Sequence, residues 1–541
     1  MSGVHTTSTS ETLAGFSGPS NLAKSISQER VLHFTDADAW FDYNQRFGRG
    51  AVLDSVVASI DKGARDVALM QTFGTNPEAA LKAWTDRLAL RLRDQMRGDD
   101  ANRLATSDWP GKVLQVLDGR GSLPGRQGLA HVAVMIRATQ TLAKLGGVVL
   151  SSLADLAVNA SMLRHNGVGI LEAYAAEMRG LLPRGAETRE VADVLGVGID
   201  RLLGAVHHRV AGEDGLTGRM AQATNIFFRL NGLAWWTDRL KESAGLMLSY
   251  NLARNAASDF ATLPGRMQAT LRRYGIEAAE WDHIRAAPQR AADGTSYLLP
   301  EAVADAETSR KLSAYLIDQV REGMTEPSAG TRAITTWGTK AGTPEGELVR
   351  TLMQFKGFTV TYMTRSIGRE FLRDGVDVGG VAHLIVATTA LGYLSMTLKD
   401  LLKGRNPREP DDADSYRKLV AAALVQGGGL GIYGDFLFGE ANRFGGGILS
   451  TLGGPTMGTA EDVQKLIAAA RGEGHFAAQA IRMGVGHTPF VNLFYSRAAL
   501  DYLVIYRMQE WANPGYLRRM EQRVKRENDQ TFWLRPTDAV R

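Results

Sequence analysis

The sequence has 541 residues, with 62 lysines and arginines against 58 aspartates and glutamates, and it contains no cysteine. A single hydrophobic core stops growing at about 250 to 300 residues, so a chain of this length predicts more than one helical subdomain. The net charge of +4 is too small to predict wholesale nucleic-acid binding. The absence of cysteine excludes disulfides, thiolate metal sites and cysteine nucleophiles.

Residues 1–29 are rich in Ser, Thr and Gly and lack the basic and apolar regions of a secretory signal, so they predict a flexible arm. Helical patterning follows an aromatic stretch that begins at Arg30. Apolar residues then recur at steps of three, four and seven, which is the spacing of one face of an α-helix. The first such face contains Leu53, Val56, Ile60 and Val67.

Helix starts can also be located from capping residues. In GTNPEAAL, Asn76 is typical of an N-cap and Pro77 of a first helical position. Residues 225–257, which include Trp235 and Trp236, show helical spacing and predict one further long helix. The sequence has no alternating run long enough for a sheet strand and no repeat of fixed period. We therefore expect an all-α fold, an elongated multi-helix assembly with little or no sheet.

Breaks in the apolar pattern divide the chain into parts. Between residues 274 and 344 the sequence is more polar and contains several Gly, Pro and Ser breakers. We expect a flexible arm (1–29), an N-terminal helical domain (30–273), a polar connector with short helices (274–344), and a C-terminal helical domain (345–541) with an apolar, glycine-rich helical insert (378–460) and a basic tail (514–541).

The insert departs furthest from an ordinary soluble protein. Its first run, VGGVAHLIVATTALGYLSMTL (Val378 to Leu398), has no formal charge and as a helix would be about 30 Å long, which matches a bilayer core. A second uncharged run extends from Leu419 to Gly434. Twelve of the 34 residues from Gly427 to Ala460 are glycine. Small residues such as Gly379 and Gly392 would let helices approach closely in lipid.

Two interpretations of the insert stay open. Its length and lack of charge favour contact with a membrane, whereas His383 and Thr388 make it only weakly apolar and favour a central helix buried in a soluble bundle. Insertion that occurs only on assembly would satisfy both patterns. The candidate membrane or subunit contacts are Val378, Leu384, Ile385, Leu391, Leu394, Leu398, Leu419, Leu424 and Leu430.

A basic helix is expected near the end of the chain, in GYLRRMEQRVKREN, after an Asn-Pro-Gly break at residues 513–515. Its cations suit the phosphates of DNA or of lipid headgroups. A solvated face, partly paired with Glu521 and Glu527, is the simpler interpretation. The candidate phosphate contacts are Arg518, Arg519, Arg523, Lys525 and Arg526.

Three fragments resemble motifs of catalytic or binding sites, and each has a simpler explanation. The ESAGLM segment that begins at Glu242 resembles the Glu-Ser and Gly-Leu-Met pieces of lytic transglycosylases, but in that family the two pieces are well separated. Residues 429–434 fit GxGxxG without the strand, helix and acidic residue that a dinucleotide site needs. His207 and His208 are adjacent and would point to different sides of a helix. We predict no catalytic residue, no metal ligand and no cofactor.

Family similarity is concentrated in four segments: RVLHFTDADAWFDYNQRFGRG (30–50), GTNPEAAL (74–81), GGGLGIYGDFLFGEANRFGGGILSTLGGPTMG (427–458) and NLFYSRAALDYLVIYRMQEWANPGYLRRMEQRVKRENDQTFWLRP (492–536). They resemble the C-terminal region of the large polyvalent proteins of tailed bacteriophages and prophages. That group includes internal virion (ejection) proteins and antirestriction-type proteins that are delivered with the DNA. The similarity extends from about Arg30 to Pro536, and its most specific parts are the glycine-rich block and the tail.

The resemblance implies a helical structural protein inside the virion that is expelled at infection and contributes to a DNA-translocation conduit across the host cell envelope. It implies a homo-oligomer that meets other ejection, portal or tail proteins, the backbone of phage DNA and the host inner membrane. It supplies no catalytic residue. The chain starts at Met1 without the long upstream regions in which larger members usually hold enzymatic domains, so we do not expect an enzyme.

Two other functions stay open. The first is a soluble, co-injected protein that protects DNA or binds a host factor, with the insert as an ordinary core. The second is a peptidoglycan-cleaving enzyme with Glu242 as its general acid and base.

Overall fold

The computed structural model describes Leu22 and residues 32–48, 52–196, 218–372, 375–429, 448–472 and 475–540. These residues form helices joined by loops. The strands among them are β1 (Arg290–Ala292) and β2 (Thr295–Tyr297), which pair antiparallel as a hairpin. The predicted all-α class with little or no sheet is confirmed.

The chain folds into two compact units whose segments alternate along the sequence. The first unit comprises Met1–Met135, Glu213–Ala223 and Ser328–Arg350, and the second comprises Ile136–Gly212, Thr224–Pro327 and Thr351–Arg541. The boundary expected near residue 274 does not coincide with this division, because residues on both sides of it belong to the second unit. Each unit therefore depends on contacts between segments that are far apart in sequence.

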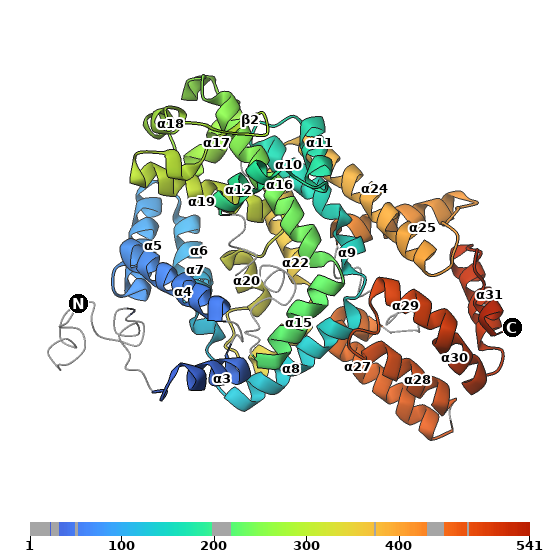
Figure 1. Cartoon of the computed structure of the whole chain (residues 1–541). Helices are drawn as coiled ribbons and strands as arrows, with labels where there is room; N and C mark the ends of the chain where they lie inside the picture. Colours follow the sequence, from blue (N-terminus) through green and yellow to red (C-terminus); the bar gives the residue numbers. More distant parts are fainter. Residues whose placement is uncertain are drawn as a thin grey trace. The chain divides into compact units, whose positions relative to one another are not determined.

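The first unit contains the helices drawn mainly in blue in Figure 1. Two of its helices, α8 and α21, continue into the second unit. The bounds are α3 (Ala37–Phe47), α4 (Val52–Phe73), α5 (Pro77–Asp94), α6 (Gly98–Thr106), α7 (Trp109–Leu117), η2 (Arg120–Ser122), α8 (Gln127–Lys144), α20 (Ala329–Thr336) and α21 (Pro344–Leu352).

This unit has a small hydrophobic core and a helix that is capped as the sequence predicts. Leu69 and Leu114 are buried together with Leu22. Helix α5 begins at Pro77, and the side chain of Asn76 accepts a hydrogen bond from the backbone N–H of Ala79 at 3.2 Å. The predicted cap is confirmed, because a cap depends on neighbouring residues alone.

The second unit begins with helices around the main core. Their bounds are α9 (Val148–Ser151), η3 (Ser152–Ala154), α10 (Asp155–His165), α11 (Ile170–Gly180), α12 (Ala186–Val194), α15 (Gly218–Leu230), α16 (Leu233–Asn255), η4 (Phe260–Thr262), α17 (Gly265–Arg273), α18 (Ala278–Arg285), η5 (Pro300–Ala302) and α19 (Ala306–Gly323). Helix α15 begins in the first unit.

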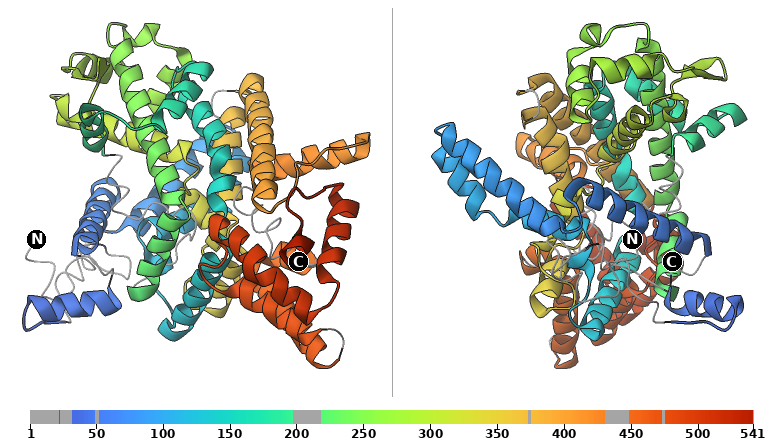
Figure 2. Two further views of the ribbon diagram at one scale, coloured as in Figure 1. Left: turned by 45° about the vertical axis from the view of Figure 1, so that its right-hand side comes forward. Right: turned by 90° about the vertical axis from the view of Figure 1, so that its left-hand side faces the viewer.

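The rest of the second unit follows from Thr351. Its helices are α22 (Gly357–Thr361), η6 (Tyr362–Ile367), α23 (Gly368–Leu372), α24 (Val378–Leu402), α25 (Ala413–Leu424), η7 (Val425–Gly429), α27 (Ile448–Ala470), α28 (Phe476–His487), α29 (Phe494–Leu500), η8 (Asp501–Ile505), α30 (Tyr506–Ala512), α31 (Tyr516–Asn528) and η9 (Pro536–Val540). Three of them, η6, η7 and η8, are π-helical turns. Figure 2 shows the orange and red helices α27 to α31 as one group near α24 and α25.

Helix α10 is the central helix of the second unit. Ten of its eleven residues are buried, and it packs against α11, α16, α19 and α24. Apolar residues such as Leu163 join the main core, but the buried set also includes Asn159, Ser161 and His165. Because a buried polar group needs a partner, these residues require a polar network in the interior.

The segment predicted as a polar connector contributes to this core. Trp281 of α18 and Tyr315 of α19 are fully buried, and the Tyr315 hydroxyl donates to Asn166 Oδ1 at 2.7 Å. Residues 225–257, predicted as one helix, form α15 and α16 instead. They are separated at Gly232, whose φ of +79° interrupts a helix.

Helices α24 and α25 form a hairpin that depends on glycine. A Cβ atom on Gly392 would overlap the carbonyl oxygen of Ala423, and one on Gly427 would overlap that of Thr388. The first uncharged run begins where α24 begins, at Val378. Helix α25 begins before the second run, because Asp412 caps it. The remainder of that run, with Leu430 and most of the GxGxxG fragment, lies outside the described residues.

Replacement of Gly392 by alanine is expected to lower the free energy of unfolding by about 1–3 kcal/mol, because a methyl group has no room against the backbone of α25. Gly379→Ala is the matched control, since a Cβ atom there would meet its nearest neighbours at an ordinary 3.6 Å. Chemical denaturation measures both. An equal loss in the two variants would contradict the close crossing.

Candidate functional site

Helix α24 has apolar side chains on the face that points away from the protein. Val378 and Val386 are 73% and 68% exposed, and Ile385, Tyr393 and Leu394 are also exposed. By length and composition it is the one helix among the described residues that could cross a membrane, or one of two if the bent pair α8 and Val148–His165 counts as a span. Only 28% of its apolar window is buried.

The opposite, buried face of α24 combines small and polar residues with the apolar Leu384 and Met396. Gly380, Leu384, Thr388, Gly392 and Met396 follow one another at steps of four, and all are buried. The Thr388 hydroxyl donates to the carbonyl oxygen of Leu384 at 2.6 Å, which satisfies the hydroxyl within the helix. A helix on the surface of a soluble protein usually buries its apolar side and exposes a polar one, whereas α24 exposes large apolar residues.

The predicted membrane or subunit contacts are divided between these environments. Leu384 is fully buried, and Leu391 packs against the cluster around Trp236 and Leu240. Leu398 and Leu419 are half-buried, and Leu430 lies outside the described residues. The exposed members are Val378, Ile385, Leu394 and Leu424.

The prediction missed other exposed apolar residues of the hairpin. These are Val386, Tyr393 and Leu401 on α24 and Tyr416 and Val420 on α25. The uncharged run has no charged side that would distinguish its outer positions from its inner ones, so these residues could not be assigned to the outer face from the sequence.

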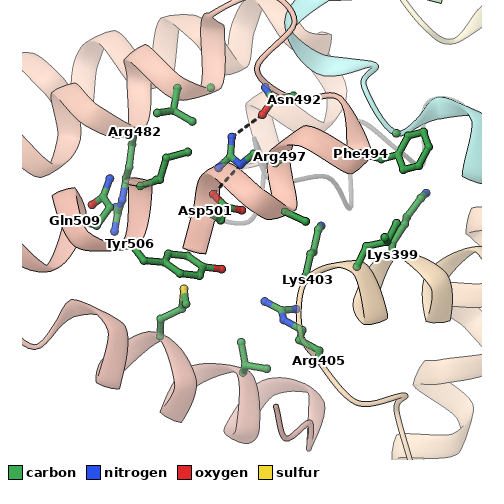
Figure 3. A pocket seen from close by; sticks show the side chains of 18 of the residues that line it. Lys399, Lys403, Arg405, Arg482, Asn492, Phe494, Arg497, Asp501, Tyr506 and Gln509 are labelled. Carbon is green, nitrogen blue, oxygen red and sulfur yellow. Dashed lines mark hydrogen bonds and ion pairs between the residues drawn. The ribbon is translucent and has the colours of Figure 1, made fainter. Parts of the chain in front are cut away.

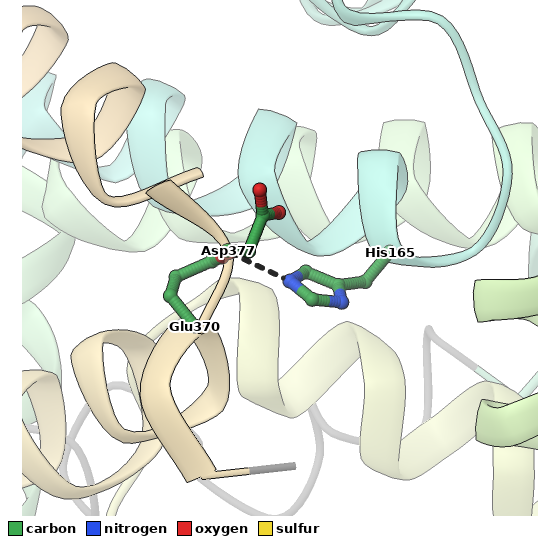
Figure 4. A group of neighbouring side chains, drawn as sticks. All are labelled: His165, Glu370 and Asp377. Atoms are coloured by element: carbon green, nitrogen blue, oxygen red, sulfur yellow. Dashed lines mark hydrogen bonds and ion pairs between the residues drawn. The ribbon is translucent and has the colours of Figure 1, made fainter. Parts of the chain in front are cut away.

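An ion-pair cluster fixes the N-terminus of α24 (Figure 4). Asp377 caps the helix by accepting a hydrogen bond from the N–H of Gly380 at 3.1 Å. The same carboxylate pairs with Arg164 of α10 at 2.5 Å and with Arg266 of α17 at 2.6 Å. The hydrogen bond from Arg164 holds the pKa of Asp377 well below its ordinary value. Helix α24 is therefore tied to two core helices by one residue.

Glu370 of α23 is the buried centre of this cluster. It has no exposed surface, and its two oxygens accept hydrogen bonds from Ser161 at 2.6 Å and from His165 Nε2 at 2.8 Å. Arg369 lies beside it and pairs with Glu322 of α19 at 3.3 Å. Helices α10, α17, α19 and α23 thus all contribute residues to this cluster of charges.

The protonation states follow from these contacts. Burial alone would raise the pKa of Glu370, but the hydrogen bond from His165 and the charge of Arg369 outweigh it, and the pKa is lowered. Burial lowers the pKa of His165, against the opposing effect of Glu370. His165 is therefore neutral, and it donates from Nε2 because an ionised carboxylate can only accept.

His165, Glu370 and Asp377 are close enough to be considered as metal ligands, since one ligand atom of each lies within 4.8 Å of the others. The surroundings do not suit a cation. Arg164 and Arg266 both pair with Asp377, and Arg369 lies against Glu370. Three guanidinium groups already compensate the two carboxylates, so the group forms a structural ion-pair cluster.

The basic helix α31 presents most of its predicted phosphate contacts to solvent. Arg518, Lys525 and Arg526 are exposed, and Arg523 is half-buried. None of these four side chains forms an ion pair with another residue in the part of the chain that the structure describes. Their charges are therefore available to an anion.

Two other charged residues of this helix form hydrogen bonds within the chain, and Arg519 is exposed as well. Arg519 donates to Asn513 Oδ1 at 2.5 Å. Glu521, which was expected to pair with the cations, accepts a hydrogen bond from the backbone N–H of Thr537 at 2.9 Å. The tail is consequently less self-paired than its sequence predicts.

The motif fragments occupy other positions. Glu242 of α16 is buried and pairs with Arg184 and, at 3.2 Å, with Arg239. This environment is that of a structural ion pair, whereas a general acid needs access to a substrate oxygen. His207 and His208 lie outside the described residues.

No protein-family model matches the chain, and no curated protein and no solved structure is detectably similar to it. A function can therefore be proposed only from the contacts and charges of the chain itself and from the resemblance of its sequence segments.

The ion-pair cluster predicts a pH dependence of stability. A histidine whose pKa is lowered on folding stabilises the fold above its unfolded pKa of about 6.5, and this contribution is lost as the pH falls. The lowered pKa of Glu370 acts in the same direction at lower pH. We expect the unfolding temperature to fall on acidification below about pH 6.5, and to fall less steeply in His165→Gln. Differential scanning calorimetry across this range measures both slopes.

The control for that experiment is His283→Gln, which removes an exposed histidine of α18. Its slope should equal that of the unsubstituted protein. Equal slopes in all three proteins would rule out the assigned protonation of His165.

Proposed function

We propose that this chain is a phage internal virion, or ejection, protein. It is a structural component that is expelled at infection and contributes to a DNA-translocation conduit across the host cell envelope. The observation that supports the proposal is the exposed apolar face of α24, which carries large side chains such as Ile385, Val386 and Leu394. The resemblance of the four sequence segments supplies the class of protein.

The length of α24 suits this role. Its 25 residues extend over about 37 Å, against about 30 Å for the hydrocarbon core of a bilayer. Within lipid, helices associate through small residues that allow close backbone contact, as Gly392 and Gly427 do in the hairpin. An outward apolar face is stable in lipid or against another subunit, and costly in water.

A second exposed apolar surface supports assembly into a homo-oligomer. On α4, Leu53, Val56, Ile60 and Val67 are each 46% or more exposed, and Leu53, Ile60 and Val67 are spaced by seven. Such spacing is typical of helices that pair with one another. Ejection through a narrow tail would also be compatible with a chain of local helices that has no disulfide.

One observation favours the alternative of a soluble protein that is co-injected and protects DNA. Arg518, Lys525 and Arg526 are exposed on one helix and have no ion-pair partner among the described residues. A DNA backbone would compensate them. In that case the outward face of α24 would be covered by a protein partner.

Flotation with liposomes separates the two functions. The full-length protein is expected to float with phosphatidylcholine vesicles. The triple variant Ile385→Gln, Val386→Gln and Leu394→Gln is expected to remain in solution, because it removes the outward apolar side chains without entering the core. The matched control replaces Leu171, Met178 and Leu182 with glutamine, since as a set they are at least as exposed and lie in or just after α11.

The control should float like the unsubstituted protein. If the unsubstituted protein stays in solution, the soluble function is favoured. If both triple variants lose flotation equally, general surface hydrophobicity is responsible and α24 has no special role.

A separate experiment tests whether the protein is located inside the virion. Mass spectrometry of purified virions is expected to detect the protein, and protease treatment of intact particles should leave it whole because the capsid encloses it. Its absence from the particles would end the ejection-protein proposal.

A further inference from the structure

The second unit contains a partly open cavity of about 210 Å³ next to the C-terminal end of α24. Its walls come from the end of α8, the last turns of α24, and α27 to α31 with η8. Figure 3 shows Lys403 and Arg405 on one side of the cavity, with Tyr506 and Arg497 opposite them and Arg482 beside Gln509. The space is several times what one water molecule needs.

The lining of this pocket is strongly cationic. Three of the lining residues that the structure describes are acidic: Asp462, Asp501 and Glu527. Asp501 is already paired with Arg497 at 2.8 Å. The basic lining residues number eight: Lys144, Lys399, Lys403, Arg405, Lys465, Arg482, Arg497 and Arg523.

Arg405 is the main observation in favour of an anion, although its guanidinium also lies over the Phe532 ring, 5.7 Å from the centroid. It is only 4% exposed, and its Nε and Nη2 atoms have no hydrogen-bond partner among the described residues. Its nearest carboxylate oxygen, on Asp400, lies 3.7 Å from Nη1. Asp400 is also shared with Arg408 at 3.1 Å and with Gln530 at 2.8 Å. Buried donors without acceptors are costly, so an anionic ligand would relieve this cost.

Two further cations point to the same conclusion. Lys144 lies 3.5 Å from His487 Nε2, and burial lowers its pKa to about 8, against the opposing charge of Asp462. Arg523 lines the pocket from α31 and forms no ion pair with any described residue. It is the one member of the predicted phosphate contacts among the described residues of the wall.

We infer that this pocket binds a phosphate ester. Guanidinium groups present paired N–H donors that match phosphate oxygens, and the pocket contains four of them. Apolar lining residues such as Leu402, Phe494 and Met520 suit the organic part of an ester. The cavity is smaller than the roughly 300 to 1,000 Å³ of pockets for drug-sized ligands, so it admits a phosphorylated group of limited size.

The ester has two sources. One is the headgroup of an anionic phospholipid, because the apolar face of α24 ends at Leu401 and Leu402, beside the pocket. Basic pockets at the end of a membrane helix hold such headgroups. The other source is a small soluble phosphate ester. The inference does not depend on the proposed ejection function.

The first experiment titrates the full-length protein with glycerol phosphate by isothermal calorimetry. Arg523→Gln is expected to weaken binding about ten-fold, because it removes one charge-assisted contact. Arg518→Gln is the matched control on the same helix, since it removes the same charge from an exposed position outside the pocket. It should bind like the unsubstituted protein. The double variant Lys144→Gln and Arg523→Gln should lose binding entirely.

Thermal unfolding shows whether a variant with weakened binding is still folded. Saturating glycerol phosphate should raise the unfolding temperature of the unsubstituted protein and of Arg518→Gln, and less so that of Arg523→Gln. Lack of binding to the unsubstituted protein would overturn the inference. So would an equal loss in Arg518→Gln and Arg523→Gln, or binding of an oligonucleotide where glycerol phosphate does not bind.

Vesicles distinguish the two sources. If phosphatidylglycerol in the vesicles increases flotation of the unsubstituted protein but not of Arg523→Gln, and glycerol phosphate competes, the ester is a lipid headgroup. If glycerol phosphate binds and Arg523→Gln floats normally, the ester is soluble. Flotation with phosphatidylcholine alone tests α24, so the proposed function and this pocket can fail separately.

Discussion

The position of α24 depends on the buried charges at its N-terminus. Glu370 has no contact with solvent and is held by Ser161 and His165 of α10, while Asp377 is held by two arginines. Removal of one partner from a buried ion pair costs about 3–5 kcal/mol, because the other charge then lacks compensation. Helix α24 can therefore begin at one place and in one rotation about its axis. Every later contact of the helix follows from that constraint.

The rotation decides which residues face the interior. Once Asp377 is fixed, positions at steps of four from Gly380 meet the core and the π-helical turn η7. Close backbone contact leaves no room for a side chain at Gly392 or Gly427. Large apolar residues at other positions, such as Ile385 and Val386, then lie on the opposite face. The outward apolar surface and the tight inner contact are thus two results of the same packing.

The features that depend on neighbouring residues could be predicted from the sequence. The all-α class, the Asn76 cap and the first residue of α24 all follow from local spacing and composition. The two faces of α24 could not be assigned, because an uncharged run has no charged side to orient it. Leu384 and Ile385 are neighbours in the sequence, yet the first is buried and the second exposed. Their difference is set by Glu370 and Gly427, which lie far away along the chain.

The pocket could not be predicted from the sequence either, because its cations come from separate helices. Arg523 was recognisable from the basic tail, but Arg405 is buried only because Gly404 ends α24 at a φ of +72° and the chain turns back. Residues after Gly404 then pair with the C-terminal segment, where the N–H of Asn406 donates to the carbonyl oxygen of Thr531 at 2.9 Å. The last turn of α24 thus has apolar residues outside and cations inside. In a bilayer that turn would lie at the level of the headgroups, where long cationic side chains are stable. The proposed membrane contact and the inferred phosphate pocket are therefore compatible in one helix, although neither requires the other.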